Sequence, residues 1–409
     1  MKSDLPEIMK QANLDALLIT GPTRHNAAMT YFTGSVHVGQ ADLLVPRGED
    51  PILVFHNPME REEASSTGLR TKNSDAYKPM ELLEKSGGDP LKAIALRYQL
   101  MFEEFGISGR VALYGKVEAG PLLTIIRYLE KLLPNVKIVG ENNLNSTLIR
   151  ARATKDEYEI EQIRDIGKST VEVVSRVAEL LKSSPVKGNI LQDREGESLT
   201  VGKVKNRINL WLAELGAENP HGTIFAPGRD GGIPHNTGQA NDPIYTGTPI
   251  VFDIYPCQSG GGYFYDFTRT WCVGHAPDEV QQAYEDVLDV YNQVSEAIKP
   301  DTLCRIYQDL TCELFEKKGH ATIRQNPSLT SGYVHSLAHG VGLEVHEGPY
   351  FRSAESNHDM VKKGSVVTIE PGLYYPERGF GIRIEDTVQV RPDGNLEILV
   401  DFPKDLVLK

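Results

Sequence analysis

Acidic side chains stand at the ends of apolar, strand-like runs in the second half of the chain, and no other feature restricts the fold as much. The run 249–253 is apolar up to Asp253, and the run 366–370 is apolar, apart from one threonine, up to Glu370. A carboxylate that a strand carries into the interior is costly unless it is paired or binds a metal. The pattern therefore predicts an interior site rich in carboxylates.

Two further segments add charged groups to this site. The glycine loop 260–262 returns the chain towards Asp266, so two antiparallel strands can bring Asp253 and Asp266 face to face. Like charges so placed repel each other, and a cation between them is the usual remedy. Alternation over residues 381–386 places Arg383 and Glu385 on one face of a strand, with isoleucines on the other.

Four histidines of the same half, His235, His335, His339 and His346, are candidate ligands or catalytic groups. His335 and His339 have zincin spacing, but Ser336 stands where the catalytic glutamate of that motif belongs. Ser336 also lacks the G-x-S-x-G turn of a serine nucleophile. The glycine runs are too short for a dinucleotide fingerprint.

Taken together, these segments resemble the catalytic signature of the metal-dependent pita-bread peptidases, the family of prolidase, aminopeptidase P and methionine aminopeptidase. The resemblance covers roughly residues 155–409, and residues 1–145 resemble the accessory domain of the proline-directed members. It implies two divalent metal ions, with manganese favoured and cobalt, zinc or iron possible. The metal ligands that it implies are Asp253, Asp266, His339, Glu370 and Glu385.

The resemblance also implies roles for the residues around the metals. Glu370 is expected to take the proton of the attacking water and pass it to the leaving nitrogen. His346 and His235 are expected to contact the substrate and the tetrahedral intermediate. His335 matches a substrate-binding histidine of the family, and a purely structural role for it stays open. Arg383 either binds a substrate carboxylate or orients Glu385.

One departure from the family pattern concerns the substrate pocket. Members usually have Asp-x-Gly at the first aspartate, whereas Asp253 is followed here by Ile254-Tyr255-Pro256, and the loop to Asp266 is slightly longer. The metal ligands are unaffected, but the neighbouring pocket is expected to differ in shape.

The first third of the chain reads as an α/β domain. Strands are expected at 16–20, 41–45, 52–55 and 136–139, with a hairpin turn at 46–51 and a helix over 121–133. Near residue 150 the pattern changes: Thr154 and Glu157 suggest a capping box before a helix to about Lys182. Further helices are expected at 277–299 and 301–319. We therefore expect an accessory α/β domain over 1–148 and an α+β pita-bread catalytic domain over 152–409.

Composition limits partners and location. The formal net charge of −13 argues against nucleic acid as a partner. The four cysteines form no CxxC pair, which is typical of reduced thiols. No apolar run approaches the length of a membrane helix, and the start lacks the pattern of a secretory signal, so a cytoplasmic protein is expected. The resemblance adds a short peptide as substrate and a homodimer as assembly.

The expected function is metal-dependent hydrolysis of Xaa-Pro bonds in short peptides, as in Xaa-Pro dipeptidases. The main alternative is an aminopeptidase P that acts on longer peptides. A methionine aminopeptidase is disfavoured because its common forms lack an α/β domain of this size. A non-catalytic binding protein on the same fold, or a creatine hydrolase, is disfavoured because all five metal ligands are present.

Overall fold

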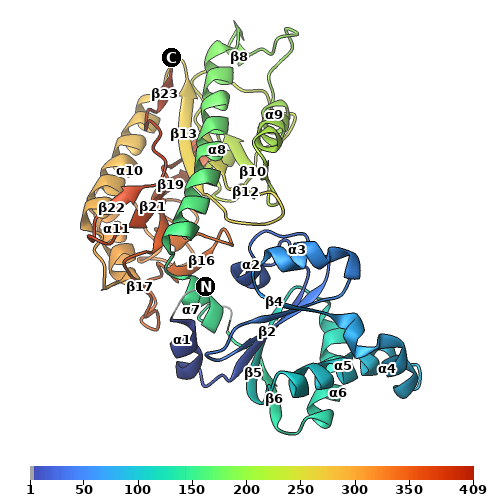
Figure 1. Ribbon diagram of the computed structural model, residues 1–409. Coiled ribbons are helices and arrows are strands. Elements are labelled where there is room, and N and C mark those ends of the chain that lie inside the picture. The colour runs from blue at the N-terminus through green and yellow to red at the C-terminus, as the bar shows by residue number, and fades with distance from the viewer. Residues whose placement is uncertain (1–3, 143) are drawn as a thin grey trace. The chain divides into compact units, whose positions relative to one another are not determined.

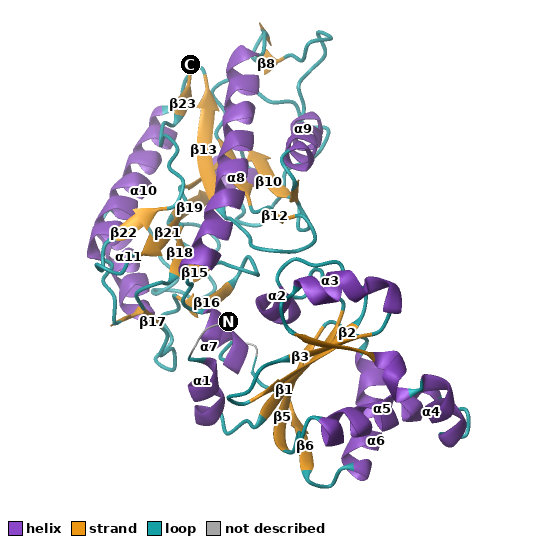
Figure 2. Ribbon diagram, in the orientation of Figure 1, coloured by secondary structure: helices purple, strands orange, loops and turns teal. Residues whose placement is uncertain are grey.

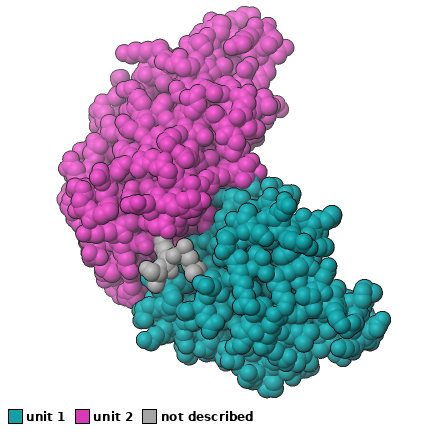
Figure 3. Space-filling view, in the orientation of Figure 1, with its two compact units in different colours: residues 1–151, 260–262 teal, residues 152–259, 263–409 magenta. Residues whose placement is uncertain are grey.

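The chain divides into two compact units, which Figure 3 colours separately. The N-terminal unit comprises Met1–Ala151 with Gly260–Gly262, and the C-terminal unit comprises Arg152–Ser259 with Tyr263–Lys409. The structure is a computed structural model that describes residues 4–142 and 144–409.

The N-terminal unit is built on one six-stranded mixed sheet of order β4-β3-β2-β1-β5-β6, with helices on both faces (Figures 1 and 2). Its strands are β1 Ala16–Gly21, β2 Ala41–Pro46, β3 Ile52–Phe55, β4 Arg70–Asn73, β5 Gly109–Gly115 and β6 Val136–Val139. Its helices are α1 Leu5–Gln11, α2 Ala27–Thr33, α3 Arg61–Ser66, α4 Pro79–Lys85, α5 Pro90–Glu104 and α6 Ala119–Leu132, and α7 Thr147–Arg152 leads out of it.

Strands β1, β2 and β3 of this sheet are buried on both faces, which explains why they are largely apolar. Leu17 and Ile19 of β1 pack on one face with Met29 of α2, whereas Leu18 packs on the other with Phe102 of α5. Such two-sided burial gives continuous apolar runs instead of alternation. The expected hairpin is confirmed, since β2 and β3 pair antiparallel.

The C-terminal unit contains two main sheets, of order β10-β11-β13-β23 and β16-β15-β18-β21-β22. Its long helices are α8 Glu157–Ser183, α9 Val201–Glu214, α10 Asp278–Ala297 and α11 Cys304–Lys317. Its strands are β7 Val186–Lys187, β8 Ile190–Leu191, β9 Ala217–Glu218, β10 Thr223–Pro227, β11 Ile250–Ile254, β12 Cys257–Gln258, β13 Phe267–Val273, β14 Thr302–Leu303, β15 His339–Gly340, β16 Glu347–Tyr350, β17 Met360–Val361, β18 Val366–Ile369, β19 Gly372–Tyr375, β20 Phe380–Arg383, β21 Asp386–Val390, β22 Leu396–Ile398 and β23 Val407–Leu408.

Three details of this unit differ from expectation. The capping box of α8 is formed by Asp156 and Glu159, not by Thr154, because Asp156 accepts from the Glu159 amide and Glu159 reaches back to it. Helix α11 begins at Cys304, because the two residues before it pair with β17 as β14. The strand expected over 381–386 is split, since β20 pairs with β19 whereas β21 pairs with β18.

Among the described residues, no helix is long and apolar enough to cross a membrane. The long helix α8 is amphipathic instead, and its buried side includes Ile163, Val173 and Val177.

Gly167 of α8 lies where this helix packs closely against Tyr265 and Val400 of the C-terminal unit. A Cβ atom there would lie 2.6 Å from Cε2 of Tyr265 and 2.9 Å from Cγ2 of Val400. Tyr265 is fully buried, so the ring has no room to withdraw. The glycine is therefore a packing requirement.

We predict that Gly167→Ala lowers the free energy of unfolding of the protein by about 1–3 kcal/mol, the usual cost of overpacking. Gly120→Ala in α6 is the matched control, since a Cβ there meets nothing within 4 Å. Removing a helical glycine should make that variant equal to or slightly more stable than wild type. Denaturant unfolding followed by circular dichroism measures both, and an unchanged Gly167→Ala midpoint would contradict the packing argument.

Candidate metal centre and catalytic site

One cavity of about 310 Å³ in the C-terminal unit brings the predicted site residues together. All nine line it: Asp253, Asp266, His339, Glu370, Glu385, His235, His335, His346 and Arg383. They come from separate segments of the chain that run from His235 to Glu385. The fold therefore assembles a site that is scattered in the sequence.

Fully buried strands carry the carboxylates to this cavity. Asp253 lies on β11, whose five residues are all buried, and the strand pairs with β10 on one side and β13 on the other. Asp266 immediately precedes β13, and Glu370 immediately follows β18. Glu385 sits at the point where the chain leaves β20 for β21, and its backbone bridges to Thr268 of β13. Rigid strands thus fix the backbone on each side of the four acids.

His339 is positioned as a metal ligand would be. Its Nδ1 lies 3.0 Å from the carbonyl oxygen of Gly340, which can only accept, so Nδ1 carries the proton. The Nε2 lone pair then faces carboxylate oxygens of Asp266 at 3.6 Å and Glu370 at 3.5 Å. Metal-bound histidines typically donate their second nitrogen to a backbone carbonyl in this way.

Gly340 makes this placement possible. A Cβ at that position would lie 2.1 Å from the carbonyl oxygen of Gly348, so the two strands β15 and β16 approach too closely for any side chain. The pairing also shifts register between His339 and Gly340. Such bulges are common beside active sites, where they direct a side chain.

Burial and mutual repulsion raise the pKa values of the acids. Burial, and then the charge of Glu385, raise the pKa of Asp266 and that of Glu370 well above their usual range. Burial, and then the charge of Asp253, raise the pKa of Glu385 to about 8. Burial likewise lowers the pKa of His339 to about 3, which keeps its imidazole neutral and able to bind a metal.

The donor set fits divalent cations. Oδ1 of Asp253 and Oδ1 of Asp266 are buried without a hydrogen-bond partner in the described part of the chain. One oxygen or nitrogen of each of Asp266, His339 and Glu385 lies within 4.8 Å of the others. Orphaned buried acceptors beside a neutral imidazole are what a bound cation would satisfy. Four carboxylates and one imidazole would hold it.

Arg383 partly balances the acids. Its Nη2 donates to Oδ2 of Asp253, and its Nε donates to the Thr268 hydroxyl at 3.2 Å. The Thr268 hydroxyl in turn donates to Oε2 of Glu385 at 2.7 Å. Arg383 is 3% exposed. This buried guanidinium contacts the Asp253 carboxylate directly and the Glu385 carboxylate through the Thr268 hydroxyl.

His335 has partners for both ring nitrogens. Its Nδ1 lies 2.7 Å from the carbonyl of Ser336, and its Nε2 lies 2.8 Å from the Tyr374 hydroxyl. That hydroxyl also accepts from Nη1 of Arg383 at 2.8 Å. Desolvation, and then the charge of Arg383, lower the pKa of His335 to about 3. His335 is therefore a neutral member of a hydrogen-bond chain, and its contact with substrate stays a prediction.

His235 and His346 differ from the other histidines, because both are exposed at the cavity and neither imidazole has a hydrogen-bond partner within residues 4–142 and 144–409. The His346 ring leans on His339 with 4.2 Å between centroids. The next residue, Glu347, is buried and accepts from Arg152 and Lys155, at 2.7 Å in each case. This ion triad anchors the segment that presents His346.

Sequence reasoning missed several residues that line or support the site. Tyr255 lines the cavity two positions after Asp253, and strand alternation could have indicated it. Tyr374 lies on β19, beyond the turn at Pro371, and its hydroxyl accepts a hydrogen bond from Arg383. No sequence pattern indicates this contact. Arg352 also lines the cavity, with its guanidinium 4.8 Å from the Tyr350 ring, and nothing in the sequence distinguishes it from a surface arginine.

Comparisons with known proteins agree with this geometry. The sequence profile described as metallopeptidase family M24 matches residues 161–392, more than half of the chain. The chain belongs to this family. A Xaa-Pro dipeptidase of Pyrococcus furiosus is 27% identical over 95% of the chain and 94% of that protein.

Solved structures share the fold over nearly the whole chain. An X-Pro aminopeptidase from Thermotoga maritima MSB8 superposes with a TM-score of 0.74 at 22% identity, covering 98% of this chain and 99% of that one. A dipeptidase from Pyrococcus horikoshii OT3 gives 0.74 at 23% identity, covering 99% and 98%. The expected fold class is confirmed: an α/β domain followed by the α+β pita-bread domain of the M24 metallopeptidases.

The raised pKa values predict how the stability of the metal-free protein depends on pH. A carboxyl group whose pKa is higher in the folded state than in the unfolded chain stabilises the fold only while it is protonated. We expect the free energy of unfolding to fall as pH rises from about 4.5 to about 8, the interval over which Glu385 ionises first in the unfolded and then in the folded protein. Denaturant titrations of chelator-treated protein across this range measure the slope.

Metal and mutation supply the controls for this slope. Saturating Mn²⁺ should reverse the trend, because metal ions bind deprotonated ligands and stabilise the folded state. Glu385→Gln should flatten the slope in the metal-free protein. A metal-free wild-type protein with equal stability at both ends of the range would refute the electrostatic account.

Proposed function

We propose that the protein hydrolyses Xaa-Pro bonds in short peptides with the help of two divalent metal ions. The observation that carries this proposal is the convergence of Asp253, Asp266, His339, Glu370 and Glu385 on one cavity, which holds two orphaned buried carboxylate oxygens and a neutral imidazole. A non-catalytic binding protein would have no need to retain this costly ligand set.

Proline as the preferred residue rests on the relatives. The Pyrococcus furiosus relative, which matches nearly the whole chain, is named for Xaa-Pro dipeptides. An aminopeptidase acting on longer peptides is the second candidate, since a structure of the same fold bears that name. The volume of about 310 Å³ lies at the small end of ligand cavities, which favours a dipeptide.

The proposed metals are Mn²⁺ ions, with cobalt, zinc or iron as alternatives that the ligand set also accepts. When bound, such ions supply Lewis acidity that polarises the scissile carbonyl and brings the pKa of water towards neutrality.

Glu370 is the proposed proton shuttle. It is less buried than the other acids and lies beside His339 at the cavity, where substrate and water have access. Its raised pKa gives it the proton affinity to take a proton from water and return it to the leaving nitrogen. The nitrogen of a scissile Xaa-Pro bond carries no hydrogen, so its protonation is needed for the bond to break.

The remaining site residues bind the substrate or orient the metal ligands. His346 and His235, whose imidazoles make no hydrogen bond to another described residue, can donate to the carbonyl oxygen as negative charge develops on it. Arg383 donates to Asp253, Thr268 and Tyr374 through Nη2, Nε and Nη1. Because all three guanidinium nitrogens already donate hydrogen bonds, these contacts support the orienting role over binding of a substrate carboxylate. His335 would support Arg383 through Tyr374 and reach substrate only by exchanging a partner.

We further propose that residues 1–148 form an accessory domain and residues 152–409 the catalytic domain. A cytoplasmic location and a homodimer are the remaining parts of the proposal, and they rest on composition and on the family resemblance.

We predict that Glu370→Gln lowers kcat by at least about 10²-fold, the lower end of general acid–base contributions, because the amide cannot carry the proton. Metal content is measured on the same sample by elemental analysis, so that loss of a ligand is separated from loss of the shuttle. Glu377→Gln, an exposed neighbour outside the cavity, should retain wild-type kcat. Near-normal kcat of Glu370→Gln at full metal occupancy would place the base elsewhere.

Proline specificity is tested with a matched pair of substrates. We predict that the Mn²⁺-loaded protein cleaves Ala-Pro at least about tenfold better than Ala-Ala in kcat/KM, a difference of about 1.4 kcal/mol in transition-state binding. Equal rates would leave a two-metal peptidase without proline preference. Cleavage of Ala-Pro-Ala in preference to Ala-Pro would favour the aminopeptidase.

A further inference from the structure

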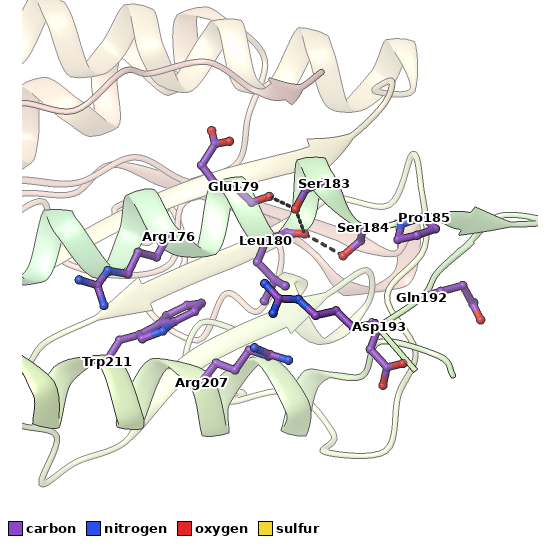
Figure 4. Close-up of a pocket in the computed structure, with 11 residues that line it drawn as sticks. Arg176, Glu179, Leu180, Ser183, Ser184, Pro185, Gln192, Asp193, Arg207 and Trp211 are labelled. Carbon is purple, nitrogen blue, oxygen red and sulfur yellow. Dashed lines mark hydrogen bonds between the residues drawn. The ribbon is translucent and has the colours of Figure 1, made fainter. Parts of the chain in front are cut away.

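A second cavity, of about 340 Å³, lies between helices α8 and α9 of the C-terminal unit (Figure 4). It shares no lining residue with the catalytic cavity. Leu180 and Ser183 face it from α8, and Arg207 and Trp211 face it from α9. Its volume is within the range of small-molecule sites.

The acidic residues of this cavity are neutralised. Asp193 accepts from Lys203 at 2.5 Å, and Glu179 pairs with Lys182 at 2.7 Å. Arg176 is likewise compensated, because it bridges the two helices to Glu214 at 3.0 Å. These pairs contribute no net charge to the cavity.

Two arginines of the cavity, Arg194 and Arg207, are uncompensated. Neither makes an ion pair or a hydrogen bond to any residue in 4–142 or 144–409. The chain carries a net charge of −13, so carboxylates are abundant, yet neither guanidinium meets one. An arginine fork matches the oxygens of a phosphate or carboxylate and binds them bidentately.

Trp211 gives the cavity an aromatic wall. The ring is half-buried and makes no stacking, cation–π or hydrogen-bond contact with another described side chain. Leu180 provides apolar surface across from it on α8. An indole face beside two free guanidinium groups is suited to a ligand that is planar at one end and anionic at the other.

We propose that this cavity binds a small organic phosphate that carries a planar ring, with the phosphate on Arg194 and Arg207 and the ring against Trp211. The site is independent of the peptidase chemistry, since it uses none of its residues. A ring-bearing carboxylate has related chemistry, and the arginine fork alone does not choose between the two, so the test compares them directly.

Tryptophan fluorescence of the full-length protein reports on this site. The chain has two tryptophans, and the other, Trp271, is 1% exposed, so a ligand-induced change arises from Trp211. We expect phenyl phosphate to change the emission saturably, with a Kd at or below about 1 mM. Phenylacetate, which replaces the phosphate by a carboxylate, and inorganic phosphate, which lacks the ring, should each bind at least about tenfold more weakly.

The arginines are tested by replacement. Arg207→Gln and Arg194→Gln should each raise the Kd of phenyl phosphate at least about tenfold while leaving peptide hydrolysis and the melting temperature unchanged, since neither side chain has a partner among the described residues. Arg305→Gln, a surface arginine of α11 outside the cavity, is the matched control and should bind as wild type does.

Three outcomes would overturn the proposal. They are the absence of saturable phenyl phosphate binding in both fluorescence and calorimetric titrations, an unchanged Kd in both arginine variants, and phenylacetate binding as tightly as phenyl phosphate. Calorimetric titration of Trp211→Phe, which keeps the arginines and an aromatic wall, distinguishes a silent probe from an absent site. If Trp211→Phe binds phenyl phosphate in calorimetry with the affinity of the wild type, the proposed site is supported.

Discussion

Four carboxylates in one largely buried cavity form the constraint on which the catalytic unit depends. Asp253, Asp266 and Glu385 are each less than 10% exposed, and Glu370 stands beside them. Burial and repulsion between neighbouring negative charges both disfavour the ionised carboxylates, and therefore the pKa values of Asp266, Glu370 and Glu385 are raised. Arg383 is the buried counter-charge that the described residues supply, and it offsets part of the repulsion. The rest is left for bound cations.

The surrounding architecture keeps the acids from relaxing apart. Each acid is attached to a strand whose neighbours are apolar and buried, so moving a carboxylate towards water would pull Val366 or Phe252 with it. Thr268 is central to this restraint, because its backbone bridges to Glu385 while its hydroxyl joins Arg383 to the same carboxylate. A stiff scaffold of this kind holds metal ligands in a preformed arrangement, at a cost in the stability of the metal-free protein.

How much of this could be read from the sequence depends on whether a residue is tied to a local pattern. Asp253 and Glu370 end apolar runs, so periodicity indicated both the strands and the acids. The residues that contact the site residues are not indicated by any local sequence pattern. Tyr374 meets Arg383 only because the β19–β20 hairpin places it there, and the break between β20 and β21 arises from competition between two sheets for one segment. Local capping was similarly ambiguous: Thr154 and Glu157 have the right spacing, yet Asp156 is the better acceptor for the orphan amides.

The orientation of His346 follows from a residue that takes no part in the chemistry. His346 lies in the bend directly before β16, where Val345 and Glu347 are buried and His346 is exposed. Fixing Glu347 inward therefore fixes the backbone that carries His346. Glu347 is 1% exposed and lies between Arg152 and Lys155, and its carboxylate pKa stays below its usual range, since these two cations outweigh the effect of burial. Removing one partner of such a pair typically costs about 3–5 kcal/mol, because a charge is left buried and alone. The start of the catalytic unit, where Arg152 and Lys155 lie, therefore helps to hold a histidine that lines the cavity.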